Sequence, residues 1–239
     1  MKKKIASLFL AGLLTMMASA AMAYEPGQRT YHILGSYLNS DFHPVHLVVE
    51  QTVNLKGLVK AEQYNKLSEA ERKIVNRTEY NEANGMVSER NIKINGEGKV
   101  TQDITRFTKD GKWYSVDRVY KTYDEIPAIR DGMRPFAENF VGWFAKTPEA
   151  GVDEATGLDY DRMIMGMRTL TFYYEKDTLN WVSYQIGAMP VFKVLEMSDK
   201  VDVDKCFEVP TEGYKRYPDN VMRSAADRSF VGAKGRKRK

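Results

Sequence analysis

The chain has 239 residues, of which 43% are hydrophobic, 28% charged and 11% aromatic, with a single cysteine. This apolar content suffices for a sizeable core and excludes an intrinsically disordered chain. The lone Cys206 excludes a disulfide framework and any zinc site built from several cysteines.

Residues 1–23 have the pattern of a secretory signal peptide. Three lysines follow Met1, an apolar run comes next, and Ala21-x-Ala23 precedes the rest of the chain. The run of about 13 apolar residues is too short to span a ~30 Å hydrocarbon core. No cysteine follows it, which argues against lipoprotein processing. We expect cleavage after Ala23, export to the periplasm and no transmembrane segment.

The formal net charge of +4 averages three unlike regions. Residues 1–23 carry +3, residues 24–213 carry −6 and residues 214–239 carry +7. A mildly acidic body in an exported chain does not indicate nucleic-acid binding. The basic terminus either binds an anionic envelope surface or forms a disordered, solubilising tail over residues 218–239. It ends in Arg236, Lys237, Arg238 and Lys239.

The spacing of apolar residues predicts a helix within residues 24–44 and a strand over residues 45–53. Ser68-x-x-Glu71 has the pattern of a capping box and predicts a short helix to about residue 76.

From Tyr80 onward the hydrophobic period is two, which indicates strands. Turn residues at 95–98 and 109–111 separate them, and two successive hairpins are typical of an antiparallel meander. The expected strands are 86–94, 100–107 and 112–120.

The meander is interrupted at Asp124, where an amphipathic helix over residues 127–146 is predicted. Strands then resume. They are expected over residues 162–174, 179–186, 191–197 and 206–210, with Cys206 buried in the last. We expect about eight strands in a single domain over residues 24–217.

The last third of the chain carries an ordered series of signals. It runs Leu179-x-Trp-Val182, Glu196-Met-Ser198, Val201-Asp202, Phe207-Glu-Val-Pro210 and Gly213-Tyr214. This series resembles the C-terminal half of the LolA/LolB-like superfamily of periplasmic lipoprotein-sorting proteins. The resemblance implies an α+β fold, in which a curved antiparallel sheet, an open half-barrel, is wrapped around one or more helices. Family members of known role carry acyl chains or lipoproteins across the periplasm.

An apolar cavity between the sheet and helix 127–146 is the candidate ligand site. Its expected lining is aromatic and methionine-rich, with Arg168 placed to meet a ligand headgroup. Methionine tolerates irregular guests, but it also fills gaps in ordinary cores, and the aromatic stripe of the helix also suits permanent packing on the sheet. The predicted lining residues are Met133, Phe136, Phe140, Met163, Met165, Met167, Phe172, Trp181 and Phe192.

Chemistry has little support in the sequence. His43-x-x-His46, with Asp41 or His32, does not fix a metal, because Pro44 and the start of a strand disrupt helical spacing. No nucleophile motif is present. We therefore expect no metal, no cofactor and no catalysis. The predicted function is binding or carriage of a lipid, or of a lipidated protein through its acyl chain. The alternative is a structural or interaction protein of the cell envelope with a filled core and no ligand.

Overall fold

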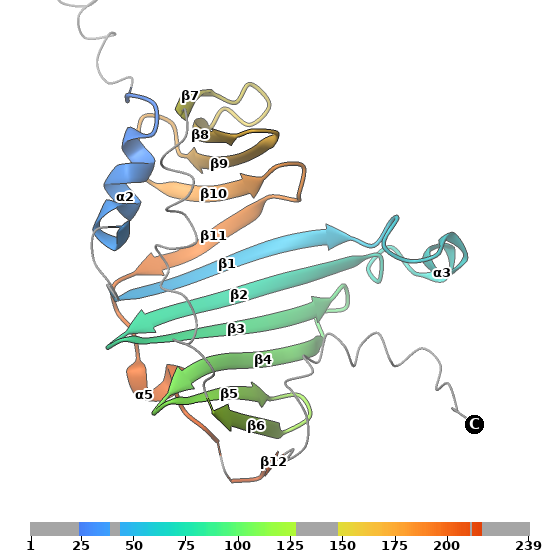
Figure 1. Cartoon of the computed structure of the whole chain (residues 1–239). Coiled ribbons are helices and arrows are strands. Elements are labelled where there is room, and N and C mark those ends of the chain that lie inside the picture. The colour runs from blue at the N-terminus through green and yellow to red at the C-terminus, as the bar shows by residue number, and fades with distance from the viewer. Residues whose placement is uncertain (1–23, 39–43, 128–147, 211, 217–239) are drawn as a thin grey trace, which may run out of the picture.

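The computed structural model describes residues 24–38, 44–127, 148–210 and 212–216, and this part of the chain forms one open sheet of twelve strands (Figure 1). The strand order is β12-β6-β5-β4-β3-β2-β1-β11-β10-β9-β8-β7, and every neighbouring pair is antiparallel except β12 with β6. The strands are β1 Val45–Asn54, β2 Lys73–Ala83, β3 Met86–Asn95, β4 Val100–Lys109, β5 Lys112–Asp117, β6 Thr122–Pro127, β7 Pro148–Val152, β8 Asp159–Met165, β9 Arg168–Tyr174, β10 Trp181–Ile186, β11 Phe192–Ser198 and β12 Lys215–Arg216.

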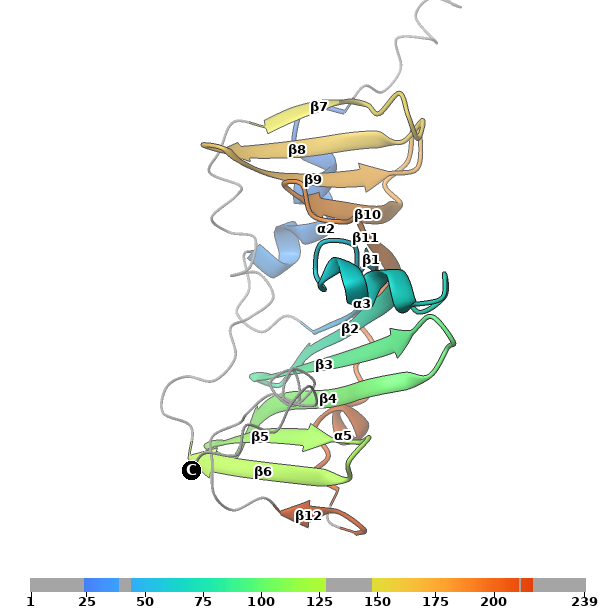
Figure 2. The same ribbon diagram turned by 90° about the vertical axis from the view of Figure 1, so that its right-hand side faces the viewer.

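Three short helices accompany the sheet in the described ranges. α2 (Gln28–Leu38) lies beside β8–β11, α3 (Ala61–Lys66) projects beyond the ends of β1 and β2, and α5 (Val203–Cys206) follows β11 (Figures 1 and 2). Within these ranges, no helix is long and apolar enough to cross a membrane.

The alternation of side chains along β1 divides the core between the two faces of the sheet. Val45, Leu47 and Val49 are buried and belong to a hydrophobic cluster that includes Leu34 of α2. The intervening residues point to the opposite face, because successive strand side chains alternate. A second cluster lies on that face, where Phe107 packs against Phe207 just after α5. We call these the α2 face and the α5 face.

Several predictions from the sequence are confirmed. The helix in residues 24–44 and the first strand are present, and the meander from residue 86 to residue 117 is antiparallel with a turn at Asp110-Gly111. The described chain is mainly an open antiparallel sheet, which agrees with the predicted curved sheet. The sheet has more strands than the eight predicted from the sequence.

The prediction of one strand over residues 162–174 is wrong, because the segment is a tight hairpin. Met165 pairs with Arg168, so Gly166 and Met167 form a two-residue turn between β8 and β9. Gly166 has a φ of 60°, which the first central residue of a type II′ turn requires and which glycine adopts without steric cost. The apolar residues that would lie on both faces of a single strand over residues 162–174 therefore belong to two strands.

Two local predictions, the helix from Ser68 to about residue 76 and the strand over residues 206–210, are wrong. Ser68 and Glu71 make the reciprocal hydrogen bonds of a capping box, but they close a turn, and β2 begins two residues later. Residues 206–210 do not form a strand, since Cys206 ends α5. The strands β2, β6, β7 and β12 were not predicted from the sequence, and Pro127 ends β6. The rest of the helix predicted over 127–146 lies outside the described residues, as do the signal peptide and the basic tail.

Gly96 marks a close approach between the β3–β4 turn and the segment before β2. A Cβ atom at this position would lie 1.5 Å from the carbonyl oxygen of Ala70. Any other residue would therefore force the two segments apart.

Candidate functional site

An aromatic cluster occupies the α2 face where β9, β10 and β11 meet. The Phe172 and Trp181 ring centroids are 5.4 Å apart, and the Tyr184 and Phe192 rings stack at 4.8 Å. Trp181 and Tyr184 also contact each other, with centroids 5.8 Å apart. Burial raises the pKa of the Tyr184 hydroxyl to about 12, because the phenolate would lose its hydration. The four rings therefore form a continuous aromatic cluster in which Tyr184 and Phe192 are half-buried.

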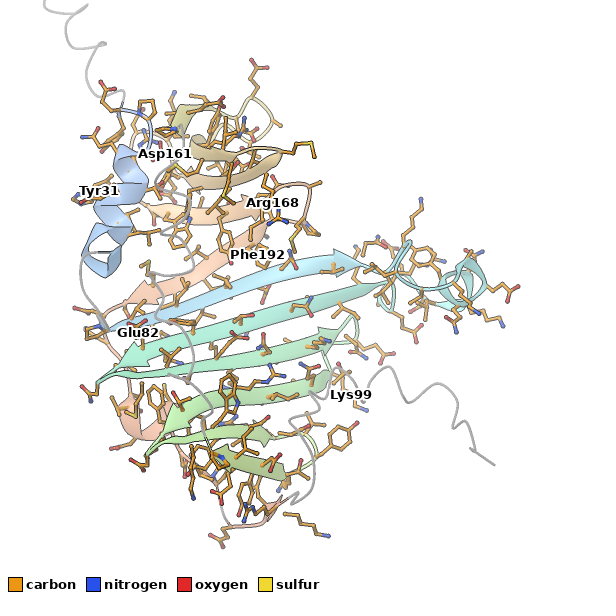
Figure 3. The ribbon with its side chains drawn as sticks, viewed as in Figure 1. Tyr31, Glu82, Lys99, Asp161, Arg168 and Phe192 are labelled. Atoms are coloured by element: carbon orange, nitrogen blue, oxygen red, sulfur yellow. The ribbon has the colours of Figure 1, made fainter. Side chains whose placement is uncertain are left out.

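The N-terminal turn of α2 is held on this face by a buried carboxylate of β8. Asp161 accepts hydrogen bonds from the backbone N–H groups of Gly27 and Thr30, at 3.1 and 3.0 Å, and from the Thr30 hydroxyl at 3.0 Å. The Thr30 hydroxyl also lies 2.5 Å from the Tyr174 hydroxyl. The first N–H groups of a helix have no partner within the helix, and the helix dipole is positive at this end. A carboxylate that accepts hydrogen bonds from these groups therefore stabilises the helix. Figure 3 shows Asp161 beside this end of α2.

A buried ion pair adds a second attachment. The Arg29 guanidinium of α2 lies 2.7 Å from the Asp159 carboxylate of β8, and both side chains are less than 10% exposed. The guanidinium also stacks over the Tyr24 ring at 4.2 Å. Two adjacent carboxylates of one strand therefore fix the position of α2 over the sheet.

The sheet opens beside the aromatic cluster, between β10 and β11. These strands pair only at Ser183–Lys193 and Tyr184–Phe192. Each strand has an extra residue nearby. Val182 is skipped in the pairing of β10 with β9, and Leu195 is skipped in the pairing of β11 with β1. Such β-bulges bend a strand and change the direction of its side chains.

The resulting opening, which we call the cleft, has a volume of about 400 Å³. Ile33 of α2 reaches it, and both bulge residues line it. The polar side chains in its wall are Asn180 and Glu196. Its full lining is Ile33, Leu179, Asn180, Trp181, Val182, Val194, Leu195, Glu196 and Met197. Seven of these nine residues are of apolar type, and the volume falls within the roughly 300–1,000 Å³ of small-molecule sites.

A second hollow, the polar groove, lies on the α5 face with a volume of about 600 Å³. Its floor is formed by side chains of β1 to β4, and residues 200–208 form one wall. Its lining is His46, Val48, Glu79, Asn81, Ser88, Arg90, Thr105, Arg118, Glu196, Lys200, Asp202, Lys205, Cys206 and Glu208.

Cross-strand networks order the floor of the polar groove. Arg90 donates to both oxygens of Asp103 at 2.8 Å and contacts Glu79 at 3.1 Å. The hydrogen bond to Asp103 is the main cause that raises the pKa of Arg90 above its ordinary value. In the next row, His46 Nδ1 lies 2.6 Å from Asn81 Oδ1, and Asn81 donates to Ser88 at 3.3 Å. The side chains on the floor of the groove therefore already form hydrogen bonds with one another.

The polar groove does not have the geometry of a nucleophilic site. Asn81 lies between His46 and Ser88 in the hydrogen-bond chain, so the imidazole does not contact the hydroxyl through this chain. Burial, and then the charge of Asp202, raise the pKa of the Cys206 thiol, which favours the unreactive protonated form. Among the described residues, no group of three or more His, Cys, Asp or Glu side chains is placed to hold a metal ion.

The predicted site residues fall into three groups. Met163, Phe172 and Trp181 are buried under or near α2, and Phe192 stacks on the cluster. Met165 is half-buried at the end of β8, and Met167 is fully exposed in the hairpin turn. Met133, Phe136 and Phe140 lie outside the described residues.

Arg168 is exposed at the start of β9, and Figure 3 shows it at the same end of the sheet as Phe192. The cleft is at the other end of the β9–β10 hairpin, where Trp181 pairs with Tyr174. The described structure therefore does not bring Arg168 to the cleft. Most of the residues that line the cleft were not predicted from the sequence, because a one-residue bulge leaves no recognisable signal.

No protein-family model matches the chain, and no curated protein matches it. Among solved structures, the chain is similar to an uncharacterized conserved protein from Thermus thermophilus, with 8% identity and a TM-score of 0.42, over 80% of this chain and all of that one. It is also similar to PNGF-II, with 6% identity and a TM-score of 0.28, over 80% of this chain and 33% of that one. The resemblance to the LolA/LolB-like superfamily remains a prediction.

Proposed function

We propose that this protein binds an apolar ligand in the cleft between β10 and β11 and carries it without performing chemistry. The observation on which the proposal rests is the pair of bulges at Val182 and Leu195. Both occur where the two strands separate, and both bulged side chains line the same opening. Bulges are enriched next to functional sites, where they redirect a side chain or end a strand pairing.

The surroundings of the cleft support binding rather than catalysis. Its wall joins the aromatic cluster through Trp181, and α2 contributes Ile33 from above. Affinity in such a site comes from apolar surface removed from water, at about 25 cal/mol per Å². The proposal includes export to the periplasm after removal of residues 1–23, and a curved sheet wrapped around α2 and the helix predicted over residues 127–146. A lipid, or a lipoprotein acyl chain, has the required chemistry.

A series of straight-chain alcohols tests the proposal. The purified protein is loaded with the apolar dye N-phenyl-1-naphthylamine, and alcohols from octanol to dodecanol are titrated to displace it. Each added methylene contributes about 0.8 kcal/mol when buried, so affinity should rise about four-fold per carbon until the cleft is full. Native mass spectrometry of the purified protein should also show a bound lipid.

A substitution that fills the cleft tests whether the ligand binds there. Val194→Trp should lower dye affinity about ten-fold or more, because the indole occupies the opening. Val191→Trp, in the exposed turn before β11, is the matched control and should leave binding unchanged. Absence of dye binding, or an affinity that does not depend on chain length, would refute the proposal and favour an envelope protein with a filled core.

A further inference from the structure

The apolar cleft and the polar groove adjoin at one residue of β11. Glu196 pairs with Val48 of β1, one step beyond the bulge at Leu195. Its side chain is 58% exposed and lies 3.8 Å from His46 Nε2, and the residue belongs to the lining of both hollows. A molecule that passes Glu196 would leave a hollow of about 400 Å³ lined mainly by apolar residue types and enter one of about 600 Å³ lined mainly by polar ones.

The charges that line the polar groove are balanced. Four cationic side chains, Arg90, Arg118, Lys200 and Lys205, face four carboxylates, Glu79, Glu196, Asp202 and Glu208. The groove therefore has no net preference for an anion or for a cation.

The charges differ in how far they are already engaged. Arg90 is neutralised by Glu79 and Asp103, and Asp202 caps α5 by accepting from the Lys205 backbone N–H. Over the described segments, no ion pair engages the exposed side chains of Lys200, Lys205 or Glu208. Both signs of charge therefore remain available on the wall of the groove.

We infer that the ligand is a zwitterionic amphiphile, with its alkyl chain in the cleft and its phosphate and ammonium groups in the polar groove. Lys200 and Lys205 would receive the phosphate, and Glu196 and Glu208 the ammonium. This assignment rests on the proposed function, since it requires that a chain enters the cleft. Its new element is the headgroup, which the charge balance of the groove selects.

Four amphiphiles with the same twelve-carbon chain separate the two parts of the inference. They are dodecylphosphocholine, dodecyl phosphate, dodecyltrimethylammonium and dodecanol, each used below its micelle concentration to displace N-phenyl-1-naphthylamine from the purified protein. Exposed ion pairs contribute up to about 1 kcal/mol each, so two pairs should make dodecylphosphocholine bind about ten-fold more tightly than dodecanol. The two singly charged amphiphiles should gain less, because each leaves one sign of charge unmatched.

Substitution of the two lysines gives the second readout. Lys200→Ala/Lys205→Ala should reduce the affinity for dodecylphosphocholine to that for dodecanol and leave dodecanol unchanged. Lys99→Ala, an exposed lysine at the far end of the sheet, is the control and should alter neither (Figure 3).

The possible failures are distinguishable. Equal affinity for all four compounds, a clear preference for dodecyl phosphate, or no effect of the double substitution would overturn the headgroup assignment and leave chain binding intact. Failure of every compound to bind would overturn the proposed function itself.

Discussion

Removal of the Asp161 carboxylate should release α2 from the sheet. In Asp161→Ala, three donors lose their acceptor, namely the N–H groups of Gly27 and Thr30 and the Thr30 hydroxyl. Asp161 is 1% exposed, so water replaces these bonds poorly. An unsatisfied buried donor costs about 1–3 kcal/mol. The Thr30 hydroxyl can turn to Tyr174, and loss of a buried charge recovers some desolvation energy, so we expect a net loss of about 3–4 kcal/mol.

Urea unfolding followed by far-UV circular dichroism measures this loss. With an m-value of about 2 kcal/mol per M, the midpoint should fall by roughly 1.5–2 M. Asp161→Asn keeps the shape and one acceptor oxygen, so its loss should be about half as large. Glu149→Gln, on the neighbouring strand β7, is the control. Its exposed carboxylate lies 3.6 Å from Arg162, and such a pair contributes at most about 1 kcal/mol.

Hydrogen exchange provides a local readout for the same variants. The amide of Thr30 should lose protection in Asp161→Ala, because its acceptor is gone, while amides of β2 and β3 should lose protection only as far as global stability falls. A stability within about 1 kcal/mol of the unsubstituted protein, or a Thr30 amide that stays protected, would show that the carboxylate does not hold α2 in place.

Three further predictions follow from single residues. The pKa of Tyr184 is about 12 in the folded protein, against about 10 in an unfolded chain, so the unfolded chain releases its proton first. Stability should therefore fall between pH 10 and pH 12, by up to about 3 kcal/mol. Tyr184→Phe should remove that part of the alkaline loss in pH-dependent urea titrations, whereas Tyr120→Phe, at an exposed position, should not. Gly96→Ala should cost several kcal/mol in thermal unfolding because of the carbonyl beneath it, and Gly98→Ala, with a φ of 80° but open space around it, only about 1 kcal/mol; equal effects would contradict the close approach. Cys206 was expected to be buried and is half-buried in the structure. The raised pKa of its thiol predicts slow modification by a disulfide reagent at pH 8 and fast modification in urea, and modification of the folded protein as fast as that of free cysteine would contradict this partial burial.

The parts of the fold that the sequence predicted are those where periodicity and turn chemistry agree. In β1 every second residue from Val45 to Gln51 is buried, and the first three of these, Val45, Leu47 and Val49, are apolar. The β4–β5 hairpin has strands of period two on both sides of Asp110-Gly111, so pattern and turn give the same register. Where the two signals conflicted, prediction failed. In residues 162–174, a long apolar run concealed Gly166, whose turn became visible only through the pairing of Met165 with Arg168.

The site was less predictable than the fold because it depends on contacts between distant segments. Phe172 and Trp181 were expected in an apolar site, since aromatic residues in strands of one hairpin meet on one face, and the structure brings them together. The attachment of α2 depends on Thr30 and Asp161, which are 131 residues apart, and no local pattern connects them. Glu196 had no predicted role, because its position between two hollows depends on the bulge beside it.

The two bulges connect the architecture to the proposed binding. A continuous antiparallel ladder would pair β10 with β11 along their whole length and would seal the sheet at this point. The extra residue at Val182 shifts β10 relative to β9, and the extra residue at Leu195 shifts β11 relative to β1, so the two strands separate beyond the Tyr184–Phe192 stack. Deletion of Leu195 would make the pairing of β11 with β1 continuous, because Val194 already pairs with Val49 and Glu196 with Val48, and Glu196 would keep its face. The same deletion would therefore remove one bulged side chain from the cleft and leave the Glu196 carboxylate at the polar groove.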